Sequence, residues 1–359
     1  MDPGLPRRLQ LRQGLVWLAA AQGDPYAALL RGLDTDPRDH WQALTRRPLS
    51  RSATGDWVTA THSVAKEVQR ASALRACPLL DAGDGADDVP WRDPDTARHA
   101  ARSWDRVLER HTGEVDLVAV AHEAAVGTLA RAWALDALAE RRLRSAVDRS
   151  RGALDAPFYP QNPAGTRRIA QGLIDVRHAV PARAPAGLLV AAAGIPMATD
   201  LLVNAVAAGT GPDDADAAAR WKSLDAQPDR AERVVRETLR LAPPVQLHAA
   251  VASTACTVAG QRIEAGERVV TVLGAANRDP RVFADPDRFD PDRPADELAG
   301  VLLPGSGRHS ALAFAVTVAR QGLLRLAAHR PFPVPGHVPF RRAAAPVSRS
   351  LVAYRVTVA

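Results

Sequence analysis

The chain has 359 residues, of which 47% are hydrophobic and 24% are charged, and its formal net charge is +6. This composition is typical of a globular protein and excludes a disordered or fibrous chain. The positive charge does not indicate nucleic-acid binding. Only Lys66 and Lys222 are lysines, and the arginines are spread among aspartates and glutamates without a basic block.

The same features predict a cytoplasmic protein with no membrane partner. No uninterrupted apolar run looks long enough to cross a bilayer, and no apolar signal core follows the first charged residues. The two cysteines, Cys77 and Cys256, agree with a reducing compartment.

In chain order, the first predicted element is a helix that begins at Asp24 and Pro25. Aspartate caps a helix N-terminus, and proline suits the first helical position because its missing N–H would be unpaired there anyway. Residues 57–61 predict a short strand and residues 63–70 a helix. Residues 76–96, which are rich in Asp, Gly and Pro, predict a loop.

Helix-forming residues dominate the middle of the chain. Residues 94–150 favour helices, and the prolines and glycine of residues 158–165 break that pattern. Residues 184–208 predict a long apolar helix that is kinked at Gly194 and Pro196, because an internal proline removes a helical hydrogen bond.

The last third predicts two more helices and three strands. The helices cover residues 228–241, which Pro243 and Pro244 terminate, and residues 311–328. The strands cover residues 251–258, 268–273 and 351–358. The fold is therefore expected to be mainly α with a minor β-sheet.

One pair of charges in the helix of residues 228–241 bears on the fold. Glu237 and Arg240 are three residues apart, so they share a helix face and can pair. Taken alone, such a pair is an ordinary surface ion pair. However, an ordered series of motifs follows it. Residues 275–280 read Ala-Ala-Asn-Arg-Asp-Pro, residues 289–294 read Phe-Asp-Pro-Asp-Arg-Pro, and residues 305–309 read Gly-Ser-Gly-Arg-His.

These four motifs, in this order across residues 228–330, closely resemble a bacterial cytochrome P-450. The resemblance implies a single cytochrome P-450-like domain over residues 1–359. It also implies that Glu237, Arg240 and Arg293 form a buried cluster that locks the core helix to the irregular segment after it. Removing one member of such a cluster costs ~3–5 kcal/mol, because a buried charge is left unpaired. That role concerns folding, not catalysis.

The departures from the family pattern concern the haem. Ala311 occupies the position of the haem-ligand cysteine, and a methyl group cannot ligate iron. In the kinked helix, Pro196 and Met197 replace the acid and the threonine that deliver protons to oxygen. Ala250 stands where the family has an arginine for a haem propionate. The family's other propionate pair has no convincing match in residues 93–102.

Arg308 and His309 are the polar remnants of the haem loop. The resemblance places His309 beside a propionate and pointing away from the iron, which argues against it as a replacement ligand. Together the losses imply a protein with no cofactor, no metal and no oxygenase activity.

The resemblance narrows further to the cysteine-less auxiliary proteins that accompany glycosyltransferases in macrolide and anthracycline biosynthesis. This narrower resemblance rests on residues 8–17 and 23–26, on the short length of the chain and on the missing thiolate. It implies a non-catalytic partner that binds, stabilises and activates a glycosyltransferase of a nucleotide-activated deoxysugar, as a hetero-oligomer. Leu15, Trp17 and Leu18 are candidate contact residues, unless they pack against the core of this chain.

Two alternatives stay open at this point. The chain could be a haem protein with a ligand other than cysteine. It could also be a cofactor-free enzyme or small-ligand binder that uses the vacated haem cavity.

Overall fold

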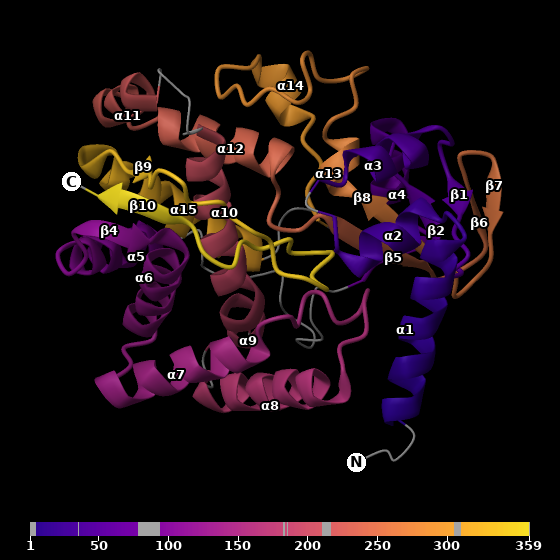
Figure 1. Ribbon diagram of the computed structural model, residues 1–359, viewed down its shortest axis with the longest axis horizontal. Helices are drawn as coiled ribbons and strands as arrows, with labels where there is room; N and C mark the ends of the chain where they lie inside the picture. The colour runs from indigo at the N-terminus through magenta and orange to yellow at the C-terminus, as the bar shows by residue number, and fades with distance from the viewer. Residues whose placement is uncertain are drawn as a thin grey trace.

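Most of the long helices gather on one side of the protein, whereas the main sheet lies on the other side together with the helices of residues 5–70 (Figure 1). This arrangement comes from a computed structural model, which describes residues 5–34, 36–77, 94–181, 184, 186–209, 217–304 and 310–358. The mainly α fold with small sheets that the sequence predicts is confirmed.

The helices of the N-terminal half are α1 (Leu5–Ala21), α2 (Pro25–Arg31), α3 (Arg38–Thr45), α4 (His62–Arg70), α5 (Pro94–Leu108), α6 (Leu117–Ala132), α7 (Ala137–Ser150) and α8 (Pro163–Ala179). Those of the C-terminal half are α9 (Gly187–Leu189), the π-helix η2 (Val190–Gly194), α10 (Ile195–Gly209), α11 (Ala217–Ala226), α12 (Arg230–Leu241), α13 (Leu273–Ala276), α14 (Ala295–Ala299) and α15 (Ser310–His329).

The main sheet has the strand order β1-β2-β8-β5-β3, in which β2 and β8 are parallel and the other neighbours antiparallel. Its strands are β1 (Ser50–Arg51), β2 (Trp57–Thr59), β3 (Leu74–Ala76), β5 (Leu247–Ala252) and β8 (Arg268–Val272). A second sheet joins β4 (Gly113–Asp116), β10 (Arg355–Val358) and β9 (Phe332–Pro333), and a hairpin joins β6 (Cys256–Val258) to β7 (Gln261–Ile263).

Local capping explains two helix starts. The Asp24 carboxylate accepts hydrogen bonds from the backbone N–H groups of Tyr26 and Ala27, and Pro25 opens α2 as predicted. Asn162 caps α8 in the same way, with Pro163 at its first position. The break in helical structure that was predicted over residues 158–165 therefore ends earlier than expected, because Pro163 already starts α8.

The central helix changes its hydrogen-bond pattern where a kink was expected. The five residues of η2 form π-type turns directly before α10, and Pro196 follows one residue later. Because proline has no N–H to donate, a shift of register there leaves fewer carbonyl groups without partners. This helix packs on α15, α6 and α12 in the middle of the helical side.

The expectation about apolar runs was wrong. Residues Gly187–Gly209 and Ser310–His329 are each long and apolar enough to span a membrane. They are core helices of this fold, however: the most apolar window of the first is 94% buried, and α15 packs on α10, η2 and α5.

The strands of the main sheet contribute side chains to two separate hydrophobic clusters. Val270 of β8 belongs to the large cluster of the helical side, whereas its neighbour Val269 belongs to a small cluster with Val64, Leu74 and Ala250. Successive side chains of a strand point to opposite faces, so β8 contributes to both cores.

The sequence predicted no helix at α1, α3, α8 or α11, and two further differences concern strands. The run predicted as one strand over residues 251–258 forms β5 and β6, separated by a bend at residues 253–255. The short strand β4 lies inside the region predicted as helical, and its partner β10 comes from the far end of the chain.

Candidate functional site

The vacated ligand position lies where the central helix meets the first turn of α15. Ala311 is fully buried there. A Cβ built on Gly194 of η2 would lie 3.3 Å from the Ala311 Cα and carbonyl oxygen and 3.2 Å from the Phe314 ring. A side chain at residue 194 would thus be tightly spaced against α15, and the glycine lets η2 approach the first turn of α15 closely.

The lost proton-delivery positions lie on the adjoining turn of α10. Met197 is fully buried in the large hydrophobic cluster and packs as an apolar side chain. Pro196 is half-buried and lines a cavity of about 70 Å³ together with Thr199 and Asp200.

These residues do not fit a haem. The side chain at the ligand position is a methyl group, which cannot ligate iron, and η2 passes close to the backbone of Ala311. Within the described part of the chain, no three His, Cys, Asp or Glu side chains form a group that could hold a metal ion.

The structure does not bring Ala250 to this place. Ala250 lies in β5 opposite Val269 and packs in the small cluster of the sheet, whereas Ala311 belongs to the large cluster. Arg308 and His309 lie outside the residues that the structure describes.

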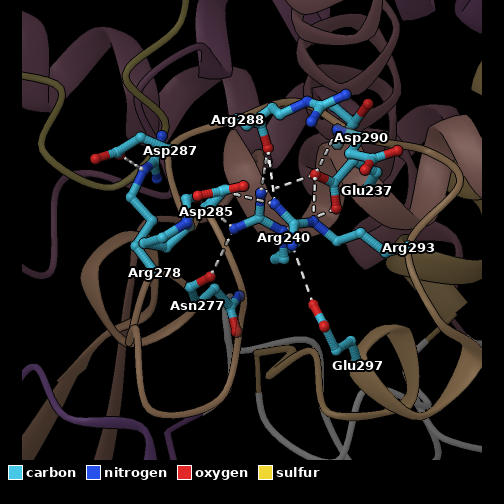
Figure 2. A network of polar contacts seen from close by, with 12 residues as sticks. Glu237, Arg240, Asn277, Arg278, Asp285, Asp287, Arg288, Asp290, Arg293 and Glu297 are labelled. Atoms are coloured by element: carbon cyan, nitrogen blue, oxygen red, sulfur yellow. Dashed lines mark hydrogen bonds and ion pairs between the residues drawn. The ribbon is translucent and has the colours of Figure 1, made fainter.

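The three charged residues of the core cluster are brought together (Figure 2). The carboxylate of Glu237 accepts hydrogen bonds from Arg240 Nη2 at 2.7 Å and Nε at 2.8 Å, and from Arg293 Nε at 3.1 Å. The backbone N–H of Asp290 adds a fourth, at 2.9 Å. Glu237 and Arg240 are 0% exposed and Arg293 is 4% exposed, so the acid is both paired and saturated.

The guanidinium groups of this cluster also hold the irregular segment after α13. Arg240 donates to the carbonyl oxygens of Asn277, Pro286 and Arg288, and Arg293 donates to that of Asp285. A segment without regular structure thus has its buried carbonyl groups satisfied by two side chains. This is a structural role, because all the contacts lie within the chain.

Two buried carboxylates escaped the sequence analysis. Asp155 accepts hydrogen bonds from the backbone N–H groups of Val347 and Ser348, and Asp200 of α10 accepts one from Ser350 Oγ at 2.6 Å. Burial raises the pKa of Asp200 to about 7 and also raises that of Asp155. Both acids fasten the C-terminal segment onto the helical core. The one available signal was an aspartate inside the apolar run of residues 187–209.

The N-terminal candidates lie on α1, which stands at the edge of the molecule (Figure 1). Leu15 is 63% exposed and Leu18 56% exposed. Trp17 is 47% exposed, but its Nε1 donates to the hydroxyl of Tyr159 at 2.9 Å and the guanidinium of Arg31 lies 3.9 Å from its ring centre. The indole therefore holds α1 to the body of the protein, and the two leucines face solvent.

Sequence comparisons relate the chain to a family of known proteins. The family model described as Cytochrome P450 matches residues 231–313. The chain is 34% identical to the cytochrome P450 family protein EryCII of Saccharopolyspora erythraea, over 96% of each chain. It is 32% identical to protein AknT of Streptomyces galilaeus, over 99% of this chain and 96% of AknT.

Solved structures show the same fold. The open form of the cytochrome P450 EryK from S. erythraea superposes with a TM-score of 0.72 at 20% sequence identity, covering 91% of this chain and 97% of EryK. P450BioI, solved in complex with a fatty-acid-loaded acyl carrier protein, gives a TM-score of 0.70 over 90% of this chain. The architecture is thus that of a cytochrome P450.

Proposed function

This chain belongs to the cytochrome P450-like auxiliary proteins that include EryCII and AknT, and from that premise we propose that it binds and activates a glycosyltransferase. The transferase would use a nucleotide-activated deoxysugar in the biosynthesis of a macrolide or anthracycline type of natural product. In this proposal the chain itself catalyses no reaction and acts in the cytoplasm within a hetero-oligomer.

The observation that carries the proposal is the closed contact between Gly194 and Ala311. The close approach, together with the methyl group of Ala311 at the ligand position, supports a cytochrome P450 scaffold that works without a haem. Binding is the plainest use of such a scaffold. The cavity beside Pro196 is about 70 Å³, well below the ~300–1,000 Å³ of small-molecule sites, which disfavours a ligand binder there.

Activation follows from population shift. A partner that binds only the competent conformation of the transferase raises the population of that conformation and stabilises its fold by mass action. At a free concentration of 100 times the Kd, this stabilisation amounts to ~2.7 kcal/mol.

We propose the outer face of α1 as the docking surface for the transferase. Leu11, Leu15 and Leu18 recur at helical spacing and are 61%, 63% and 56% exposed, whereas Val16 and Ala19 are buried. Because α1 carries arginines but no acidic residue in this stretch, the complementary surface would be an apolar groove with an acidic rim.

A sugar-transfer assay with and without this protein tests the proposed activity, with the transferase melting temperature measured in both arms. We expect a higher rate and a higher melting temperature when the protein is present. Equal rates and equal melting temperatures would contradict the proposal.

The docking surface is tested separately by Leu15→Lys. This variant should keep the melting temperature of the chain and lower the affinity for the transferase by about tenfold or more. Val338→Lys is the control, because Val338 is an apolar residue outside α1 that is 79% exposed, more than Leu15. Equal loss of affinity in both variants would remove α1 from the interface.

A further inference from the structure

One end of the molecule is more basic than the rest. The helices α7 and α8 cover this end, and the N-terminal half of α1 lies beside them (Figure 1). Residues 136–179 contain eight arginines and five acidic residues, and residues 5–22 contain three arginines and no acidic residue. These two segments carry as much surplus positive charge as the whole chain, whose net charge is +6. The sequence has no basic block, but the fold gathers its surplus at one end.

The outer face of α7 presents two adjacent arginines. Arg141 and Arg142 are exposed and form no ion pair within the described residues, and the exposed Leu138 lies one turn before them. The acid that they influence is Asp136, whose carboxylate caps α7. The backbone N–H of Ala139, a second backbone N–H and the two arginines lower the pKa of Asp136. One carboxylate thus faces two guanidinium groups, and one positive charge remains.

The outer face of α8 has the same pattern. Arg167, Ile174 and Arg177 are exposed and share one side of the helix, because they are seven and three residues apart. The neighbouring Arg168 is exposed as well. In the part of the chain that the structure describes, none of these three arginines forms an ion pair. The opposite, buried side of the helix consists of Ile169, Gly172 and Val176.

The other arginines of this end are held by acids. The ion pairs are Arg144–Glu140, Arg149–Asp175 and Arg151–Asp148. The pair of Arg149 and Asp175 joins α7 to α8 at 2.7 Å. The surplus charge therefore lies on the outer faces of the two helices and not between them.

This mixture of side chains fits an acidic protein surface. A second copy of the chain would bring like charges together, which is unfavourable. A lipid surface is favoured by clustered basic residues without acids, whereas Glu140, Asp148 and Asp175 stand among these arginines. Leu138 and Ile174 are 49% and 48% exposed and supply apolar contact between the charges. Arginine with apolar contact is typical of protein interfaces.

We propose that the α7–α8 face, formed by Leu138, Arg141, Arg142, Arg167, Arg168, Ile174 and Arg177, binds an acidic surface of the glycosyltransferase. This inference rests on the proposed activation of a transferase and extends the contact beyond α1. The leucines of α1 supply the apolar contact. The arginines of the α7–α8 face act mainly on the association rate, because exposed charges attract a partner over several ångströms and salt screens that attraction.

Association kinetics with the transferase test the proposal at about 50 and about 500 mM NaCl. We expect the association rate constant to fall about tenfold or more between these concentrations, with a much smaller change in the dissociation rate constant. An association rate constant that does not depend on salt would overturn the proposal, even if the transferase is bound and activated. Absent binding at both concentrations would contradict the proposed function itself, and this inference with it.

A double variant locates the effect. Arg141→Gln combined with Arg142→Gln should lower the association rate constant at low salt about threefold or more and weaken its dependence on salt. Arg46→Gln combined with Arg47→Gln is the matched control, because these adjacent arginines are also exposed and follow α3 on the opposite side of the molecule. Equal effects of the two double variants would show that net charge acts and not this face, which would overturn the proposal.

A second measurement uses the unaltered chain. Phenylglyoxal modifies accessible arginines, and mass spectrometry locates the adducts. The transferase should protect Arg142, Arg167 and Arg177 but leave Arg46 reactive. Protection by vesicles of phosphatidylserine, and not by the transferase, would assign the α7–α8 face to an anionic lipid surface and contradict the proposal.

Discussion

At the scale of single residues, the vacated haem position is defined by what surrounds Ala311. Its methyl group is enclosed by α15 and by the glycine of η2, and the backbone atoms of the two helices are in contact. A cysteine at this position would have its sulfur in a packed core, because Ala311 is 0% exposed. The loss of the thiolate is therefore only one part of the change.

Ala311→Cys should not restore haem binding. The added sulfur overpacks a filled site and lowers the free energy of unfolding by ~1–3 kcal/mol, and no Soret absorption should follow the addition of haem. Ala311→Ser is the size-matched control and should behave alike in both measurements. A stoichiometric Soret band in the cysteine variant alone would contradict the closed contact.

Asp200 gives the stability of the protein a defined pH dependence. Its pKa is about 7 in the folded chain, whereas an unfolded aspartate loses its proton near 3.8. The folded state therefore holds more protons between these values, and the free energy of unfolding falls as pH rises from 4 to 7, by at most ~1.4 kcal/mol per pH unit.

Asp200→Asn should flatten this fall, because an amide can still accept from Ser350 and does not titrate. Urea unfolding at pH 4.5, 6 and 8 measures the effect. The slope should decrease without vanishing, since the raised pKa of Asp155 acts in the same direction. Asp105→Asn, at an exposed residue, should keep the unaltered profile; an unchanged slope in the Asp200 variant would reject the assignment.

At the scale of elements, α12 carries the charged side chains that hold the irregular segment after α13 in place. Its buried face pairs Glu237 with Arg240 and Arg293, and its exposed face carries the pair Glu232–Arg236, in which both side chains are 53% exposed. This helix thus carries one carboxylate–guanidinium pair that is buried and one that is exposed to solvent.

Glu237→Gln should lower the free energy of unfolding by ~3–5 kcal/mol, because the buried Arg240 guanidinium loses its carboxylate partner and Arg293 keeps only Glu297. Glu232→Gln on the same helix should change it by less than ~0.5 kcal/mol, because solvent screens the exposed pair. Chemical denaturation of both variants makes the comparison, and similar losses in the two would show that burial does not decide the effect.

Sequence patterns predicted several of the long helices, but not α1 or α8, and missed elements that depend on distant partners. The helices α12 and α15 and the start of α2 follow from periodicity and capping. The strand β4 could not be predicted because its pairing partner, β10, lies more than 200 residues away. The π-type turns of η2 have no local sequence signature beyond a nearby proline.

The same contrast holds for the candidate site. The residue changes at Ala311, Pro196 and Met197 could be read from the sequence by resemblance. The contact that closes the space between Gly194 and Ala311 could not, because it depends on how two helices from distant parts of the chain cross.

At the scale of the whole molecule, the main sheet joins the two hydrophobic clusters. Val269 and Val270 are neighbours in β8 and serve different clusters, so neither core can separate without loss of this strand. We therefore expect one cooperative unfolding transition and a single domain. Tryptophan fluorescence and far-ultraviolet circular dichroism should give coincident urea curves, and two separated midpoints would contradict this prediction.

The leucine row on α1 has a consequence for handling the protein. Apolar side chains held in fixed register on a protruding helix attract one another between molecules as readily as they attract a partner. A purified stock of this chain alone should turn cloudy as it is concentrated, and mild detergent should clear it. Production together with a partner that covers these leucines should therefore keep the protein in solution for longer.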